Sequence, residues 1–409
     1  MLNTSDLYNK QIKILLLTPI YPSSDLICQT SVVHTFAKDW IALGHRVRVI
    51  HNIVSFPTIV YFVASFFKDL IESKFGTKIN YTKVKLDSKF VVDGVEVFRF
   101  PMFKSLPHGR YPKKEIENQI RKIELTNEID GFIPDIIIGH WTNPQLELLP
   151  RLGEIYNSKT CLIFHDKGND FRNIYLKDGD FLLSRIDVIG YRSAVIKKHI
   201  EANIGLFERS FICHSGLSKV FLEDSKLKVV KDEICNYVFV GDFFERKNPI
   251  ILLEALDKSY NDQPFVLDYV GTGYEKNRII RSAKKMNQFS KIKFHGQLSQ
   301  DHVKDLLFGA DCFIMLSKNE AFGLVYLEAM ALGCLTVCSR NDGVDGIIVH
   351  GENGFLCEEG NVSELSCLID KIRSLPLFER KRISDNAIAT SKMFSSFEVA
   401  KNYLNHIVS

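Results

Sequence analysis

The chain has 409 residues, more than one typical hydrophobic core holds, so the length predicts two domains. Apolar residues make up 45% and charged residues 25%, which is the balance of a soluble globular protein and not of a disordered or membrane-spanning one. A net charge of +3 is too small for nucleic-acid binding driven by bulk charge.

The cysteines indicate a reducing compartment. There are nine of them, an odd number without a C-x-x-C pair, and several lie in apolar runs where a free thiol packs as a small hydrophobic group. The chain starts with the polar run Met1–Asp6 and shows no signal peptide. We therefore expect a cytosolic protein with free thiols, and we expect no metal centre.

The predicted elements of the first half alternate between strand and helix. A short apolar strand at 12–17 precedes a helical pattern from Val32 to Leu43, which stops at Gly44, and a second strand follows at 47–50. Further strands are predicted at 135–138, 161–164 and 187–189, with a helix at 144–154. Strand, helix and strand with a short return predict a parallel sheet covered on both faces, that is, a doubly wound α/β domain.

Residues 51–114 break this alternation. The stretch 53–67 is apolar and aromatic, contains Pro57, and is too short to span a bilayer. The whole segment holds eleven Lys and Arg against five Asp and Glu. An apolar patch beside a basic one suits peripheral contact with an anionic membrane, whereas a core helix under a solvated basic surface explains the same composition.

In the second half the α/β pattern restarts, with predicted strands at 237–240, 265–270, 292–294 and 311–316, each followed by a helical segment. We predict an N-terminal Rossmann-like domain at 1–218, a C-terminal Rossmann-like domain at 219–385, and a helix at 386–409 that crosses back to the first domain. Two such domains in series predict a cleft, with ligands beyond the carboxyl ends of the strands.

The stretch 317–333 carries the strongest functional signal. A polar turn after the strand leads into an Ala, Leu and Met-rich helix that ends at Gly333. The helix start near Gly323 offers unpaired N–H groups that can hold a phosphate, and two carboxylates, Glu320 and Glu328, flank it. The alternative is an ordinary amphipathic helix in which Glu328 is merely solvated.

Other candidates are weaker when taken alone. Arg246 and Lys247 follow a strand and suit a diphosphate clamp, although exposed basic pairs are common. Gly271 begins either a phosphate loop or a simple turn. His165 at a strand end is either an active-site hydrogen-bond donor or a core histidine. The sequence Asp178-Gly179-Asp180 suggests a metal–nucleotide motif, but we interpret it as a turn.

Taken in order, these motifs resemble the retaining family 4 glycosyltransferases (glycosyl transferases group 1) of the GT-B fold. The resemblance rests on five segments: Gly241 to Lys247, Val270 to Gly273, Phe294 to Gly296, Glu320 to Glu328 with its Phe-Gly and Glu-Ala-Met-Ala, and Gly351 to Leu356. The first half matches more loosely through Gly44-His45-Arg46-Val47 and through Pro134 to Ile137 with His140-Trp141. The resemblance implies two doubly wound Rossmann-like domains that face each other across a cleft.

The resemblance also implies roles for the site residues. Glu328 would bind the ribose hydroxyls, and Arg246 with Lys247 would neutralise the diphosphate. Glu320 and His165 would be catalytic and contact the reacting sugar. The remaining donor-binding residues would be Phe322, Gly323, Leu324, Val325, Gly271 and Gly296.

The function implied is retaining transfer of a hexose or N-acetylhexosamine from a nucleotide-sugar, expected to be a UDP-sugar, to a hydroxyl of a cell-surface glycan or lipid-linked acceptor. Neither a cofactor nor a metal is expected. The usual Gly-Gly of the family's first loop is Cys28 to Ser31 in this chain, which leaves a non-catalytic sugar-nucleotide-binding subunit as an alternative. A GT-B sugar-nucleotide epimerase is the other alternative.

Overall fold

The computed structural model describes residues 10–26, 30–75, 80–222, 228–261 and 263–409. The chain divides into two compact units. Unit 1 comprises Met1–Lys68, Lys78–Ser215 and Ser396–Ser409, and unit 2 comprises Asp69–Thr77 and Gly216–Ser395. The sequence placed the two main boundaries at 218/219 and 385/386, whereas the contacts place them at 215/216 and 395/396.

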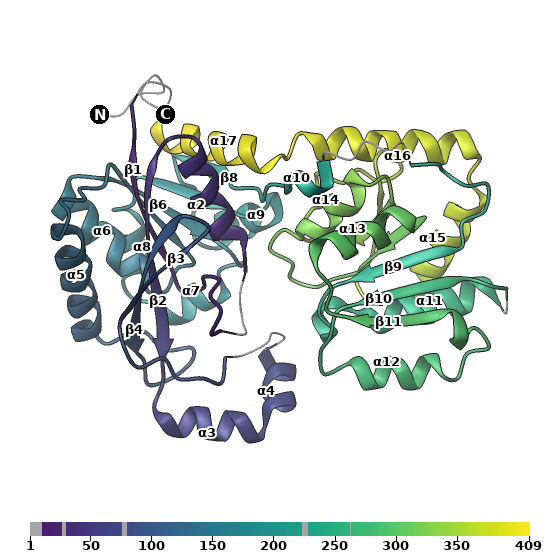
Figure 1. Ribbon diagram of the computed structural model, residues 1–409, viewed down its shortest axis with the longest axis horizontal. Helices are drawn as coiled ribbons and strands as arrows, with labels where there is room; N and C mark the ends of the chain where they lie inside the picture. The colour runs from purple at the N-terminus through teal and green to yellow at the C-terminus, as the bar shows by residue number, and fades with distance from the viewer. Residues whose placement is uncertain (1–9, 27–29, 76–79, 223–227, 262) are drawn as a thin grey trace. The chain divides into compact units, whose positions relative to one another are not determined.

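Unit 1 is built on an eight-stranded sheet in the order β3-β4-β2-β1-β5-β6-β7-β8 (Figure 1). All neighbouring strands are parallel except β3 and β4. The central strand β1 has fully buried side chains from Ile14 to Leu17, as expected for a parallel strand covered on both faces. The strands are β1 (Lys13–Thr18), β2 (Arg46–Ser55), β3 (Ser88–Val92), β4 (Val95–Phe103), β5 (Ile136–His140), β6 (Lys159–Phe164), β7 (Val188–Tyr191) and β8 (Ser210–Ile212).

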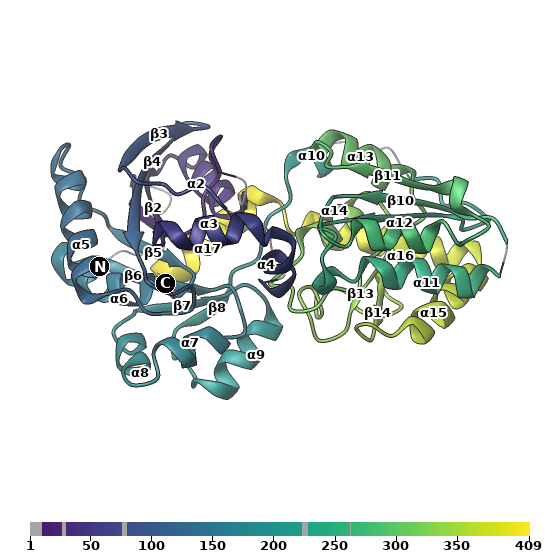
Figure 2. The ribbon, with the colours of Figure 1, turned by 90° about the horizontal axis from the view of Figure 1, so that it is seen from below.

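Helices cover both faces of this sheet. One face is covered by α2 (Val32–Ala42) and α17 (Ser396–Val408), the other by α5 (Lys113–Glu128) and α6 (Gln145–Tyr156) (Figures 1 and 2). The doubly wound arrangement predicted for the first half is confirmed. The remaining helices are α3 (Thr58–Phe66), α7 (Asn169–Ile174), α8 (Gly179–Leu183) and α9 (Ala194–Asn203); α4 (Lys68–Phe75) follows α3 in the chain.

The segment 51–114 contains structure that the sequence analysis missed. The strand expected at 47–50 continues to Ser55, so only part of the apolar stretch 53–67 is helical, as α3. Strands β3 and β4 form an antiparallel hairpin around Asp93-Gly94, both with positive φ (47° and 80°). An Asp-Gly pair between alternating apolar residues is a standard hairpin signal and was available in the sequence.

Unit 2 has a six-stranded parallel sheet in the order β11-β10-β9-β12-β13-β14. Four of its strands, β9 to β12, match the predicted ones closely, whereas β13 and β14 were not predicted. The strands are β9 (Asn236–Val240), β10 (Val266–Val270), β11 (Ile292–Gly296), β12 (Cys312–Ile314), β13 (Leu335–Ser339) and β14 (Phe355–Cys357).

The helices of unit 2 also form two layers (Figure 1). One layer consists of α11 (Pro249–Tyr260), α12 (Lys276–Ala283) and α15 (Val362–Ser374). The other consists of α13 (Gln300–Gly309), α14 (Leu324–Ala331) and α16 (Leu377–Lys392). Short elements are α10 (Lys219–Leu222) and the 3₁₀ turns η1 (Glu245–Lys247) and η2 (Phe289–Lys291).

The last helix, α17, completes the core of unit 1. The indole Nε1 of Trp40 on α2 donates to the carbonyl of Ala400 at 2.9 Å, and the ring of Tyr403 packs edge-on against Phe36 and Trp40. Its boundary differs from the predicted 386 because residues 386–392 continue α16, which packs on α14 in unit 2.

Two further observations bear on the environment of the chain. No helix among the described residues is both long enough and apolar enough to cross a bilayer. The eight cysteines in the described ranges are free thiols, and Cys28 lies outside those ranges.

Candidate functional site

Three adjacent strands of unit 2 end at or directly before glycines whose backbones approach closely. The N–H of Gly241 donates to Val270, and the N–H of Gly271 donates to Gly296 at 2.8 Å. A Cβ on Gly271, where φ is +134°, would lie 1.9 Å from the Gly241 carbonyl oxygen, so only glycine fits there. The predicted donor-binding residues Gly271 and Gly296 therefore lie together at the carboxyl edge of the sheet, where α/β domains bind ligands.

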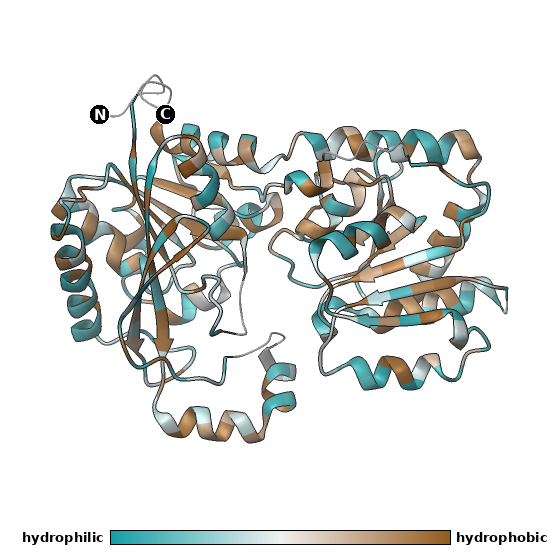
Figure 3. Ribbon diagram, in the orientation of Figure 1, coloured by the Kyte–Doolittle hydropathy of each residue, from teal (hydrophilic) through white to brown (hydrophobic). Residues whose placement is uncertain are grey.

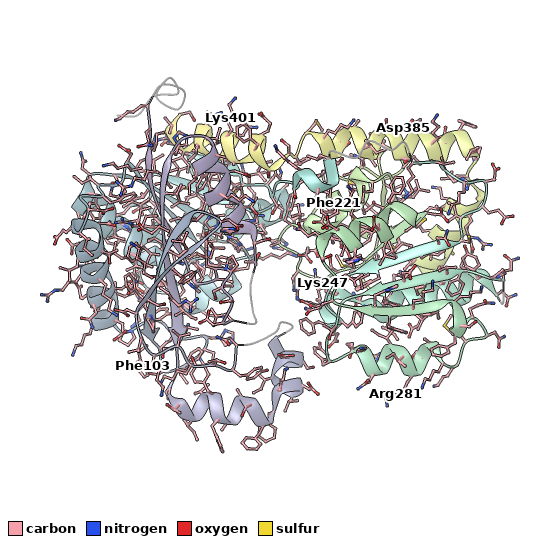
Figure 4. The ribbon with its side chains drawn as sticks, in the orientation of Figure 1. Phe103, Phe221, Lys247, Arg281, Asp385 and Lys401 are labelled. Carbon is pink, nitrogen blue, oxygen red and sulfur yellow. The ribbon has the colours of Figure 1, made fainter. Side chains whose placement is uncertain are left out.

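The predicted phosphate clamp lies at the same edge. Arg246 and Lys247 form the turn η1 after β9, and Figure 4 shows Lys247 beside the ends of the unit 2 strands. The Lys247 ammonium forms an ion pair with the carboxylate of Glu320, and both side chains are nearly buried. The Arg246 guanidinium lies 3.7 Å from the same oxygen. Lys247 of the predicted phosphate clamp and Glu320, the carboxylate predicted to contact the sugar, are thus the two partners of one ion pair.

The charge state of Glu320 follows from these neighbours. Burial acts to raise the pKa of the Glu320 carboxyl, but the positive charges of Lys247 and Arg246 outweigh it and hold the pKa below its ordinary value. The carboxylate is therefore ionised at neutral pH.

The start of α14 supplies free hydrogen-bond donors beside this pair. Gly323 has a φ of +84°, and a Cβ there would lie 2.5 Å from the ring of Tyr326 and 3.1 Å from Glu320 Cγ. The amides of Gly323, Leu324 and Val325 have no hydrogen-bond acceptor among the described residues. Three such N–H groups and the positive end of the helix favour an anion.

Glu328, one turn further along α14, is partly buried. Its carboxylate has no hydrogen-bond or ion-pair partner among the described residues. Burial raises its pKa from 4.5 to about 7. A carboxylate kept from water without a partner is costly, so this group is suited to bind hydroxyls of a ligand.

Asp342, which was not predicted from the sequence, also shapes this site. The Glu320 amide donates to both oxygens of Asp342, at 3.0 and 2.8 Å, and the Gly343 amide returns a bond to the Glu320 carbonyl. Asp342 is 22 residues away in the chain, and no local pattern signals the contact. Phe322, predicted to bind the donor, is almost fully buried in the unit 2 core.

His165 lies in unit 1, directly after β6. Its ring stacks on Trp141, with centroids 3.7 Å apart and planes 15° apart, and its Nε2 lies 2.8 Å from His140 Nδ1. Burial holds the pKa of His165 well below its ordinary value, and the neighbouring His140 and Arg192 lower it further. His165 is thus a partly exposed, neutral imidazole. Its contacts with Trp141 and His140 were not predicted from the sequence.

The motif set aside as a turn has a structural partner. The Asp178 carboxylate forms a bidentate pair with Arg110, which also binds Glu147. The described residues contain no group of three His, Cys, Asp or Glu side chains arranged to hold a metal ion.

Residues 223–390 match the family model described as "Glycosyl transferases group 1". The chain is 33% identical over 126 residues to the N-acetyl-alpha-D-glucosaminyl L-malate synthase of Bacillus anthracis, covering 31% of this chain and 32% of that protein. It is 29% identical over 205 residues to an uncharacterised glycosyltransferase of Methanocaldococcus jannaschii, covering 50% of this chain and 54% of that protein. The chain thus aligns with a third to about half of the length of these curated relatives.

A solved structure shares the whole fold. HepE of Anabaena, solved in complex with UDP-glucose, superposes with a TM-score of 0.63 over 96% of this chain and 98% of that chain, at 18% identity. The GT-B fold predicted from the sequence is confirmed, and so is the resemblance to group 1 glycosyltransferases.

Proposed function

We propose that this protein is a group 1 glycosyltransferase that transfers a hexose or N-acetylhexosamine from a UDP-sugar to a hydroxyl of a cell-surface glycan or lipid-linked acceptor, with retention of configuration. The observation that carries the proposal is the nearly buried Lys247–Glu320 ion pair, which lies beside three amides at the start of α14 that have no acceptor among the described residues. HepE, which shares the fold, was solved with UDP-glucose, and this favours UDP as the nucleotide.

The chemistry of the site fits this reaction. Breaking the bond between sugar and diphosphate leaves negative charge on the phosphate and positive charge on the sugar. Arg246, Lys247 and the amides of Gly323 to Val325 would stabilise the leaving diphosphate, and Glu320 would face the sugar. These groups supply charge without a metal, so we propose that none is required for catalysis.

The remaining roles follow the resemblance. Glu328 would accept hydrogen bonds from the ribose hydroxyls. Gly271 and Gly296 would let the nucleotide approach the strand ends closely. His165 would offer a neutral imidazole nitrogen to a hydroxyl of the transferred sugar.

The binding half of the proposal is tested by calorimetric titration with UDP. Wild-type protein is expected to bind it, and Lys247→Ala and Glu328→Gln are each expected to weaken binding about tenfold or more, because a hydrogen bond to a charged group contributes about 1.5–3 kcal/mol. Glu254→Gln, an exposed glutamate on α11, is the matched control. Unchanged binding in both site variants would refute the assignment.

The catalytic half is tested by donor turnover and product analysis. Glu320→Gln is expected to retain UDP binding and lose transfer. Binding of UDP without hydrolysis or transfer of any donor would identify a non-catalytic subunit. Release of an altered free sugar nucleotide without an acceptor would identify an epimerase.

We also propose that the protein acts in the cytosol at an anionic membrane surface, which it contacts through α3. Ile59, Phe62, Val63, Phe66 and Phe67 lie at helical spacing and are 45–70% exposed. The helix lies beyond the carboxyl ends of β2 and β4, and it is hydrophobic along most of its length (Figures 2 and 3).

The opposite side of α3 anchors it to unit 1. Ala64 is buried, and the Tyr61 hydroxyl contacts the Phe56 amide and the Val54 carbonyl. The helix itself carries no charged residue, and lysines stand at both ends: Lys83 Nζ lies 3.5 Å from Thr58 Oγ1, and Lys68 follows the helix. An apolar stripe between cations suits insertion among acidic lipid headgroups.

Co-sedimentation with phosphatidylcholine vesicles, with and without phosphatidylglycerol, tests this contact. Phe62→Ser with Phe66→Ser is expected to lower partitioning by more than tenfold, since burying each phenylalanine contributes about 1.5–3 kcal/mol. Phe378→Ser, an equally exposed residue of α16, is the control. Partitioning that neither variant changes, or that does not need phosphatidylglycerol, would refute the proposal.

A further inference from the structure

Two histidines and a tyrosine form a hydrogen-bonded chain in unit 1 that ends at His165. His140 is fully buried at the end of β5, with its Nδ1 2.8 Å from His165 Nε2. Its other nitrogen, Nε2, lies 3.3 Å from the hydroxyl of Tyr403. These three residues come from β5, the loop after β6, and α17, so segments far apart in the chain meet at one contact.

The rings of these three hydrogen-bonded residues are fixed by packing. Trp141 stacks on His165, and Tyr403 packs edge-on against Phe36 and Trp40 of α2. The nitrogen of His165 that remains, Nδ1, contacts no hydrogen-bonding group in the described part of the chain. The orientation of Nδ1 is therefore set by the stack on one side and by the bond to His140 on the other.

The proton positions on His165, His140 and Tyr403 are coupled through their hydrogen bonds. A neutral imidazole has one donor nitrogen and one acceptor nitrogen, so a choice at His140 dictates the choice at His165. Both histidines are neutral, because burial holds their pKa values well below the ordinary value and the Arg192 cation lowers them further. Only two arrangements remain, and they differ in which nitrogen of His165 carries hydrogen.

Tyr403 decides between the two arrangements. A phenol is a stronger acid than an imidazole N–H, and an imidazole nitrogen is a stronger acceptor than a phenol oxygen. The hydroxyl also contacts the Cys213 thiol, but sulfur is a weak acceptor. The favoured arrangement is Tyr403 O–H donating to His140 Nε2, and His140 Nδ1–H donating to His165 Nε2.

We infer that Tyr403 and His140 are positioning residues that hold His165 as its Nδ1–H tautomer, so that it presents a hydrogen-bond donor to a ligand. The inference rests on the proposed function only for the identity of that ligand, a sugar hydroxyl. The His165 Nδ1–H is uncharged and already oriented, so it needs no reorganisation when the ligand binds. The last helix of the chain thereby sets the chemistry of a residue that follows β6.

Nitrogen-15 NMR of histidine-labelled protein tests the inference without any substrate. The His165 signals are assigned by their loss in His165→Gln, and couplings from the ring protons identify the protonated nitrogen. Wild type is expected to show Nδ1–H alone. Tyr403→Phe, which removes only the hydroxyl, is expected to show a mixture of tautomers. Tyr260→Phe in unit 2 removes another buried, hydrogen-bonded hydroxyl and is expected to change nothing.

An Nε2–H tautomer in wild type, or an unchanged tautomer in Tyr403→Phe, would overturn the inference. Kinetics give a second readout. His140→Leu and Tyr403→Phe are expected to lower kcat about three- to tenfold with the donor KM unchanged, as expected for one lost hydrogen bond. His140→Asn, whose side-chain amide keeps a donor near the Nδ1 position, is expected to restore most of the rate. If His165→Ala transfers sugar as wild type does, the role of His165 in the proposed function fails, while the tautomer result stands separately.

Discussion

Replacing Glu328 with glutamine is expected to stabilise unit 2 at neutral and alkaline pH. Burial raises the pKa of this carboxyl from 4.5 to about 7, and no described residue compensates its charge. The unfolded chain releases the proton near pH 4.5 and the folded chain near pH 7, so stability falls as the pH rises between these values. At 1.36 kcal/mol per pH unit, the full cost is about 3 kcal/mol. Glutamine cannot ionise, so the variant does not carry this cost.

The assay is denaturant unfolding of Glu328→Gln and wild type at several pH values. Unfolding of two units is not a single two-state transition, so each needs its own probe. Both tryptophans, Trp40 and Trp141, lie in unit 1, so their fluorescence reports the unfolding of unit 1 alone. Far-UV circular dichroism reports the unfolding of both units. The stability difference should be near zero at pH 4.5, reach about 3 kcal/mol at pH 8, and leave the tryptophan transition unchanged.

Glu254→Gln on the exposed face of α11 serves as the control and should show no such pH dependence. A variant no more stable than wild type at pH 8, or a difference that is the same at every pH, would refute the reasoning. The variant that gains stability is also the one expected to lose UDP affinity, because the same carboxylate is proposed to bind ribose.

Lys247→Ala removes the closest positive charge from the nearly buried Glu320 carboxylate and leaves it with the Arg246 guanidinium at 3.7 Å, so it should lower the free energy of unfolding by about 3 kcal/mol. Lys247→Arg keeps a positive charge and should lower this free energy much less. Thermal unfolding of the two variants compares them, and equal midpoints would contradict this account. Gly323→Ala forces a side chain into a φ of +84° and against a neighbouring ring, so it should destabilise unit 2 by more than 1 kcal/mol. Gly296→Ala has a similar φ but open space, so it should cost less; the reverse order in denaturant unfolding would contradict the steric argument.

The fold was predictable because its signals are local. Apolar runs such as 237–240 and 265–270 are each followed by a glycine and lie between helical segments, so β9 and β10 could be predicted directly. The β3–β4 hairpin was missed although Asp93-Gly94 marks its turn, because the surrounding basic residues were taken as a surface feature. The helix boundary at 385/386 was wrong because the continuous helical pattern of α16 hides where packing changes from unit 2 to unit 1.

The candidate site was only partly predictable. Glu320, Lys247 and Gly323 stand out through residue type and spacing, and the structure brings them together. The contacts that set their behaviour are long-range: Asp342 binds the Glu320 amide, and Tyr403 meets His140 across 263 positions of the chain. No periodicity in a single sequence encodes such pairs. The sharing of one ion pair by Lys247 and Glu320 likewise appears only in three dimensions.

The position of α17 has a consequence for how the protein is made. A domain synthesised first usually folds first, as it leaves the ribosome. Here, the residues that close the core of unit 1 over Trp40 and Phe36 are translated only after residues 216–395 of unit 2. Until then the nascent unit 1 exposes the apolar face that α17 later covers, and we expect chaperones that bind apolar surfaces to recognise it. Unit 2, nearly continuous in sequence, can fold while unit 1 waits.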